Sequence, residues 1–194
     1  EVDKQWSDHH AGIPGKVQLV RYADDMVLLA KTALEAKESW NRLQEQFVAM
    51  KLTVNQEKSR LTAVARGFTF LGFEFRKLKN KPLYLWPRAK SVKNICERVR
   101  KVIRSFKSSE LLVEVIRNLN RVLIGWCTYF RVGNSNRVFH KVDYAVRSQL
   151  QLWLRRKHRC TWGKAKKQWN YRYLHGRCRL YRMVGKVSHL EGVR

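Results

Sequence analysis

Two adjacent carboxylates, Asp24 and Asp25, are the side chains of this sequence best suited to chemistry. They interrupt two short apolar runs in the stretch VQLVRYADDMVLLA, residues 17–30. Such runs are typical of buried strands, and a polar break between them is typical of a tight hairpin. Burying an ionised carboxylate is costly unless it is paired or binds a cation, and Mg²⁺ is held by one or two carboxylates together with phosphates. The pair is therefore a candidate Mg²⁺ site, with a solvated Asp-Asp turn as the alternative.

The charge balance of the chain points to a polyanionic partner. Its 194 residues include 41 Lys and Arg against 15 Asp and Glu, a formal net charge of +26, so nucleic acid is the first candidate. Seven Trp, seven Tyr and eight Phe favour a folded protein, of one domain or two small ones, over a disordered basic chain. The sequence has no apolar run of transmembrane length, and a basic peripheral membrane protein is the weaker alternative.

The cysteines fit free thiols in a reducing compartment, because none of the four forms a C-x-x-C pair. The alternative is a tetrahedral Zn²⁺ site, although the spacing of its ligands matches no common zinc finger. That site would use His158, Cys160, His175 and Cys178.

The first half of the chain predicts strands and one helix. The polar residues 1–16 predict a connector, and Thr32 with Glu35 has the spacing of a capping box that opens a helix. Apolar residues then recur at steps of three and four up to Met50, so this helix should pack on the sheet that carries the Asp pair. Aromatic alternation over residues 68–75 predicts a second hairpin, which breaks at glycine. The run 83–87 predicts a last short strand, which ends at proline.

The hydrophobic period changes from Arg88 onward. Three helical stripes follow, over residues 95–106, 111–126 and 138–154, with a break at Gly133 and Asn134 between the last two. Amphipathic helices joined by short loops predict a small helical bundle.

A basic and aromatic tract follows, with no acidic residue from Tyr144 to Leu190. Cations bind phosphates, and aromatic faces such as those of Trp153, Trp169 and Tyr171 stack on unpaired bases, a mixture suited to RNA. A solvated basic face is the alternative, but it does not account for the interleaved aromatics. The candidate RNA-binding residues are Arg147, Arg155, Arg156, Lys157, Arg159, Lys164, Lys166, Lys167, Arg172, Arg177 and Arg179.

Several of these segments, in this order, resemble one protein family over about residues 17–160. The Tyr-Ala-Asp-Asp hairpin of residues 22–25 looks like the catalytic hairpin of reverse transcriptases, and Phe-Leu-Gly-Phe at 70–73 is similar to their primer grip. Gly125-Trp126 followed by Tyr129-Phe130, then Asp143-Tyr144 and residues 153–156, resembles the maturase-specific thumb of group II intron reverse transcriptases.

The resemblance implies an α+β fold: the C-terminal half of a reverse-transcriptase palm, an all-α three-helix thumb and a basic tail. The corresponding domains are residues 1–87, 88–158 and 159–194. It also implies an RNA-directed DNA polymerase, a nucleotidyltransferase that binds group II intron RNA, promotes its splicing and copies an RNA template from a DNA primer. Asp24 and Asp25 would hold catalytic Mg²⁺ in a two-metal site. Near the primer or nucleotide would lie Tyr22, Lys58, Phe70, Leu71 and Gly72.

The family's metal site needs a third carboxylate from a strand upstream of the hairpin, and Asp3 and Asp8 do not match that motif. We therefore expect a fragment that does not polymerise DNA alone and whose partner is the N-terminal half of the enzyme or a second copy. The expected location is the bacterial cytoplasm, in association with nucleic acid, with an organelle as the alternative. A non-catalytic RNA-binding and splicing module that keeps only a relic of the polymerase site is the second hypothesis. A general basic DNA-binding protein is the third, and it leaves the hairpin motif unexplained.

Overall fold

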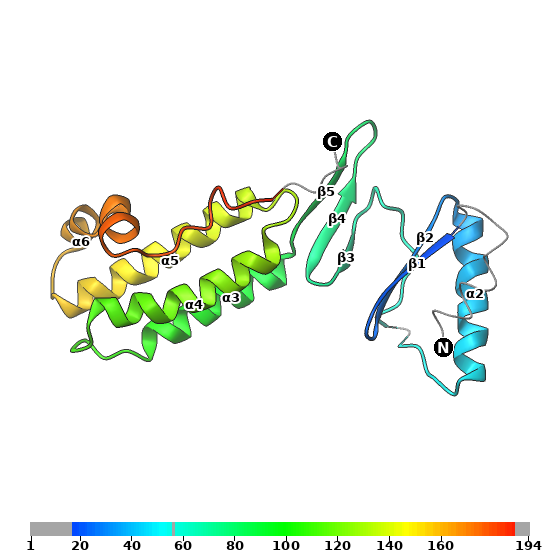
Figure 1. Ribbon diagram of the computed structural model, residues 1–194, viewed down its shortest axis with the longest axis horizontal. Coiled ribbons are helices and arrows are strands. Elements are labelled where there is room, and N and C mark those ends of the chain that lie inside the picture. Colours follow the sequence, from blue (N-terminus) through cyan, green and yellow to red (C-terminus); the bar gives the residue numbers. More distant parts are fainter. Residues whose placement is uncertain (1–16, 56, 189–194) are drawn as a thin grey trace. The chain divides into compact units, whose positions relative to one another are not determined.

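The computed structural model describes residues 17–55 and 57–188, and its fold is α+β, as predicted. The chain divides after Leu71 into two compact units, each of which is described by itself. The elements of both units are labelled in Figure 1. The domain limits at residues 87 and 158 stay predictions.

The first unit is built on the predicted hairpin. Strands β1 (Val17–Tyr22) and β2 (Asp25–Ala30) pair antiparallel, in a register that runs from Val17 opposite Ala30 to Tyr22 opposite Asp25. Helix α2 (Ala33–Ala49) follows directly.

A complete capping box starts α2. The Thr32 hydroxyl accepts a hydrogen bond from the Glu35 N–H, and the Glu35 carboxylate accepts one from the Thr32 N–H. Leu43 and Phe47 of α2 are buried against residues of β1 and β2, among them Leu19 and Leu28. The predicted packing of this helix on the hairpin is therefore confirmed.

Short strands form the second sheet, whose strand order is β3-β4-β5. These strands are β3 (Phe68–Phe70), β4 (Phe73–Lys77) and β5 (Leu83–Pro87). Strands β4 and β5 pair antiparallel, with Phe75 opposite Leu85.

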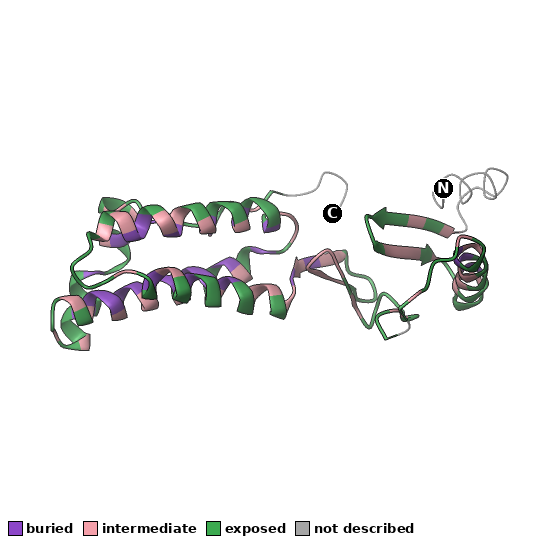
Figure 2. Ribbon diagram, turned by 90° about the horizontal axis from the view of Figure 1, so that it is seen from below, coloured by how far each residue is buried: buried purple, intermediate pink, exposed green. Residues whose placement is uncertain are grey.

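Three long helices make the core of the second unit: α3 (Ala89–Arg104), α4 (Leu112–Phe130) and α5 (Asn136–Lys157). They coincide with the three predicted stripes. Figure 2 shows buried residues running along these helices, whereas the β1–β2 hairpin is exposed or half-buried. Fully buried side chains include Val99 of α3, Leu119 of α4 and Phe139 of α5.

The break between α4 and α5 holds strand β5 against the bundle. Gly133 takes a positive φ of 73°. Asn134 then makes two hydrogen bonds to Leu85 of β5, as a neighbouring strand would. Its N–H donates to the Leu85 carbonyl oxygen (2.8 Å), and its side-chain oxygen accepts from the Leu85 N–H (3.3 Å).

The basic segment after α5 is folded rather than a loose tail. It contains helix α6 (Trp162–Gln168) and the short π-helix η1 (Arg172–Arg177). Residues 179–188, here called the C-terminal strap, then run back along the bundle (Figure 1). Leu180 and Met183 of the strap are buried in the same core as the helices.

Candidate functional site

The turn that carries the Asp pair consists of Ala23 and Asp24, between the paired residues Tyr22 and Asp25. Ala23 has a φ of 52°, and the Arg21 Nε donates to its carbonyl oxygen at 3.0 Å. Two-residue hairpin turns require such positive φ values because their twist must match that of the strands. The structure thus displays both aspartates and the tyrosine at one tip.

Both aspartates are exposed, and Tyr22 is 66 % exposed. The expectation that the flanking runs are buried strands is therefore wrong at this end of the hairpin. Its physical reason is that α2 covers only one face of a two-stranded sheet, so that Val20 and Leu29 on the other face are 38 % and 39 % exposed. The aspartates need no partner to offset a burial cost.

The donor set fits Mg²⁺ in kind. Carboxylate oxygens are hard ligands, and Mg²⁺ in proteins takes one or two of them and completes its shell with water and phosphate. Within residues 17–55 and 57–188, no three His, Cys, Asp or Glu side chains are grouped to hold a metal ion. Asp24 and Asp25 therefore supply part of a site, and a third carboxylate is not beside them in the described chain.

Lys58 lies in a turn that Asn55 organises. The Lys58 N–H donates to the Asn55 main-chain and side-chain oxygens at 3.2 and 3.1 Å, and the Lys58 side chain is exposed. Its ammonium is free to approach a phosphate from this turn, although its proximity to a nucleotide stays a prediction.

Phe70 ends β3, and Leu71 and Gly72 form the turn that precedes β4, with positive φ values of 48° at Leu71 and 80° at Gly72. The Gly72 carbonyl oxygen accepts from the Ser91 hydroxyl (3.1 Å) and from the Arg88 N–H (2.9 Å). A Cβ at Gly72 would stand 3.3 Å from the Phe130 ring, so glycine allows close packing here. A role of these three residues at a primer terminus stays a prediction.

The candidate RNA-binding cations differ in their exposure and in whether they already make hydrogen bonds within the protein. Lys157 donates to the carbonyl oxygens of Ser108 and Glu110, both at 2.7 Å, and so closes the loop between α3 and α4. Arg147, Arg155 and Lys157 are half-buried. The remaining candidates are exposed: Arg156, Arg159, Lys164, Lys166, Lys167, Arg172, Arg177 and Arg179.

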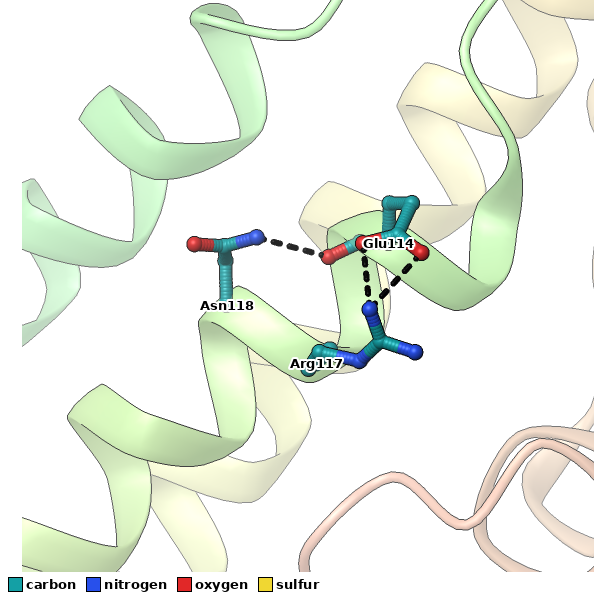
Figure 3. Close-up of polar contacts among 3 residues, drawn as sticks. All are labelled: Glu114, Arg117 and Asn118. Carbon is teal, nitrogen blue, oxygen red and sulfur yellow. Dashed lines mark hydrogen bonds and ion pairs between the residues drawn. The ribbon is translucent and has the colours of Figure 1, made fainter.

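Where an acid is available on the bundle, it neutralises its neighbour. Glu114 near the start of α4 holds the Arg117 guanidinium with both carboxylate oxygens, at 2.9 and 3.0 Å (Figure 3). Asn118 adds a bond to the Glu114 carbonyl oxygen. The basic tract that starts at Tyr144 has no acidic residue before Glu191, so its many cations have few acids to pair with, and most of their charge is left for an external anion.

Two of the tryptophans expected to stack on bases are buried instead. Trp153 is 7 % exposed and donates its indole N–H to the Phe106 carbonyl oxygen (3.2 Å). Trp169 is 3 % exposed, and its ring lies 5.0 Å from that of His158. These residues hold the tract to the bundle, whereas Tyr144 and Tyr171, at 63 % and 41 % exposed, present ring surface to solvent.

Two of the four candidate Zn²⁺ ligands have other partners. His175 Nδ1 lies 2.9 Å from the Leu180 carbonyl oxygen, and Cys178 interacts with the Tyr173 hydroxyl. All four cysteines are free thiols. Within residues 17–55 and 57–188, these side chains are not part of any group of three that could hold a metal ion.

The sequence reasoning missed a set of side chains that clamp the C-terminal strap. Asp143, which is 6 % exposed, accepts from the N–H groups of Met183 (3.2 Å) and Val184 (3.1 Å). Burial raises the pKa of Asp143, and these hydrogen bonds oppose that rise. On α4, Asn120 accepts from the Tyr181 N–H (2.7 Å) and donates to the Arg179 carbonyl oxygen (2.9 Å). The sequence does give one sign of this clamp, because Asp143 is an acid within the apolar stripe of α5.

Comparison with known families divides the chain in the same order as its motifs. The family described as reverse transcriptase (RNA-dependent DNA polymerase) matches residues 1–75, which include the Asp hairpin. The family described as group II intron, maturase-specific domain matches residues 92–173, which extend from within α3 through α6. A search of curated proteins found no match. In the described part of the chain no helix has the length and apolar character needed to cross a membrane.

Proposed function

Because the chain belongs to the family of group II intron reverse transcriptases and maturases, we propose that it binds group II intron RNA and contributes the Asp hairpin of the polymerase site. Promotion of intron splicing is part of the same proposal. Both matched families imply nucleic-acid binding. The identity of the nucleic acid, group II intron RNA, is the part that we propose for this chain.

One observation carries the proposal: each matched region presents the chemistry that its family requires. The reverse-transcriptase region displays Asp24 and Asp25 together at an exposed hairpin tip. The maturase-specific region and the strap that follows it carry many exposed cations and few acids, together with the exposed rings of Tyr144 and Tyr171. Phosphate binding and base stacking need these two kinds of group.

In the polymerase site we assign Asp24 the principal role in holding Mg²⁺ and Asp25 that of its partner. Mg²⁺ bound there supplies Lewis-acid charge stabilisation for nucleotidyl transfer. The tight turn holds both carboxylates at one exposed place, which a nucleotide triphosphate and a primer terminus can reach. Tyr22, beside them, offers an exposed ring and hydroxyl for positioning, and Lys58 offers a cation for phosphate.

We also propose that residues 1–194 alone do not extend a primer. The described residues bring no third carboxylate to the Asp pair, and the two-metal scheme needs one. The same observation supports the second candidate function, a non-catalytic RNA-binding and splicing module in which the pair is a relic.

Primer extension on an RNA template with Mg²⁺ tests the proposal. The chain is assayed alone and then mixed with a separately expressed N-terminal reverse-transcriptase segment, and RNA binding is measured in parallel. Asp24→Ala is the catalytic variant, and Asp8→Ala, an acid outside the motif, is the matched control.

Extension by the mixture only, lost in Asp24→Ala and kept in Asp8→Ala, is the expected result. Salt-sensitive RNA binding without extension in either case favours the binding module. Robust extension by the chain alone contradicts the claim that its metal site is incomplete, and absence of RNA binding contradicts the proposed function as a whole.

A further inference from the structure

Two tyrosine rings and two guanidinium groups alternate on the surface of the second unit. The Arg147 guanidinium carbon lies 5.4 Å from the centre of the Tyr144 ring and 5.8 Å from that of Tyr171. The Arg182 guanidinium carbon lies 5.7 Å from the centre of the Tyr171 ring. All three distances are within cation–π range. These four residues, here called the Tyr–Arg cluster, come from α5, the start of η1 and the strap.

Contacts within the fold fix the position of the Tyr–Arg cluster, but part of both tyrosine rings stays exposed. Tyr144 and Arg147 are three residues apart on α5 and so share a face of that helix. The Tyr171 ring also packs on His175, with ring centres 4.6 Å apart. Even so, Tyr144 stays 63 % exposed and Tyr171 41 % exposed. An exposed aromatic face that is already ordered loses little entropy when a planar ligand stacks on it.

An open groove of about 570 Å³ adjoins the cluster along the strap, and its lining includes His175, Arg179, Arg182 and Lys186. Burial lowers the pKa of His175, and Arg147 and Arg182 lower it further, so the imidazole is harder to protonate than a free one. A larger hollow of about 680 Å³ lies along α2, but its lining includes Glu45 and no cation. Of these two hollows, the groove at the strap is therefore the one better suited to an anion.

The charge of the groove is only partly offset by the described part of the protein. Asp143 is the nearby acid; it is buried, accepts hydrogen bonds from the strap N–H groups and interacts electrostatically with Arg182, so one negative charge faces several cations. No ion pair involving Arg147, Arg179, Arg182 or Lys186 occurs among the described residues. Like charges gathered in this way repel one another, and a phosphate in the groove would relieve that repulsion.

We propose that the Tyr–Arg cluster and its groove bind one unpaired nucleotide of RNA. The base stacks on the free face of Tyr144, and the flanking phosphates meet Arg147, Arg182 and the strap cations. A base can stack in this way only when it is out of a duplex, so the site selects single-stranded segments, loops or bulges. This inference rests on the proposed function, since it names where and how the RNA is held.

The test uses the full chain and a single-stranded RNA of about twelve nucleotides with one 2-aminopurine, whose fluorescence falls on stacking. Tyr144→Leu removes the ring, while Tyr144→Phe keeps it and removes only the hydroxyl. Arg147→Gln removes a cation of the cluster, and Arg137→Gln, an exposed arginine of the same helix outside the cluster, is its control. The same RNA in a perfect duplex is the second ligand, and thermal unfolding of every variant checks its fold.

Tyr144→Leu is expected to weaken single-strand binding about 5- to 100-fold and to abolish the quenching. Tyr144→Phe should bind within about twofold of the parent protein, because it keeps the stacking face. Arg147→Gln should lower the slope of log affinity against log salt by about one, and Arg137→Gln should leave it unchanged. Duplex binding should not respond to Tyr144→Leu.

Single-strand binding and quenching that persist in a folded Tyr144→Leu protein would overturn the site while leaving the proposed RNA binding intact. A parent protein that binds neither single strand nor duplex overturns both. Equal losses for single strand and duplex in Tyr144→Leu would show that stacking on an unpaired base is not what the residue does.

Discussion

Gly133, in the short loop between α4 and α5, offers the sharpest test of how the second unit is held together. Its φ of 73° lies in the left-handed region, and a Cβ there would stand 2.5 Å from Leu85 Cγ and 2.9 Å from the Leu85 carbonyl oxygen. The carbonyl cannot retreat freely, because it also accepts the hydrogen bond from Asn134. Gly133→Ala must therefore displace strand β5 or the loop.

The cost has three parts. A non-glycine residue in the left-handed region costs about 1–2 kcal/mol, forcing a methyl group into packed atoms about 1–3 kcal/mol, and weakening the Asn134–Leu85 bonds about 1 kcal/mol. Because relief of one part relieves another, we expect Gly133→Ala to lower the free energy of unfolding by roughly 2–5 kcal/mol. The matched control is Gly125→Ala within α4, where a Cβ meets nothing within 4 Å. It should raise that free energy by about 0.5–1 kcal/mol.

Urea denaturation followed by tryptophan fluorescence measures both values, because Trp126 and Trp153 lie in the bundle core of this unit. A midpoint for Gly133→Ala equal to that of the parent protein would refute the reasoning, since it would mean that Leu85 does not fill the space over Gly133. A loss in Gly125→Ala as large as that in Gly133→Ala would show that any methyl group in this region is harmful, and the argument from contact would fail.

The other predictions concern single polar groups. Thr32→Ala should cost the first unit about 1 kcal/mol, because it removes the capping box, and circular dichroism at the helix band should show a lower melting temperature. Asp143→Ala should lower the free energy of unfolding by roughly 2–4 kcal/mol and expose the strap amides to hydrogen exchange, because two N–H groups lose their acceptor. Burial, together with Arg147 and Arg182, lowers the pKa of His175 from its ordinary 6.5, so the unfolded chain binds the proton more readily. Stability should accordingly fall as the pH drops below about 6.5, and His175→Gln should flatten that part of a denaturation series.

Local patterns predicted most of the elements. The capping box at Thr32, the hairpin around Asp24 and the three long helices each depend on residues a few positions apart, and each is present. The break at Gly133 is where it was expected. These features could be predicted because hydrogen-bonded turns and helical periods depend on residues within a short window of sequence.

Features that depend on distant partners were not predictable in this way. The strap clamp joins Asn120 to Tyr181 and Asp143 to Met183, which are 61 and 40 positions apart. The burial of Trp169 likewise depends on a helix bundle formed earlier in the chain, so its ring looked available for bases. The exposure of the Asp tip has the same cause, since apolar residues on both faces of β1 and β2 gave no sign that only one face would be covered.

The long sequence separation of the strap contacts also has a kinetic consequence. The helices form from contacts four residues apart, whereas docking the strap closes loops of 40 to 61 residues, so we expect it to dock after the bundle has assembled. Substitutions in the clamp should then speed unfolding more than they slow folding. Because Arg182 and Lys186 reach the groove only when the strap is docked, RNA bound there would favour the docked state by mass action and complete the folding of its own binding site.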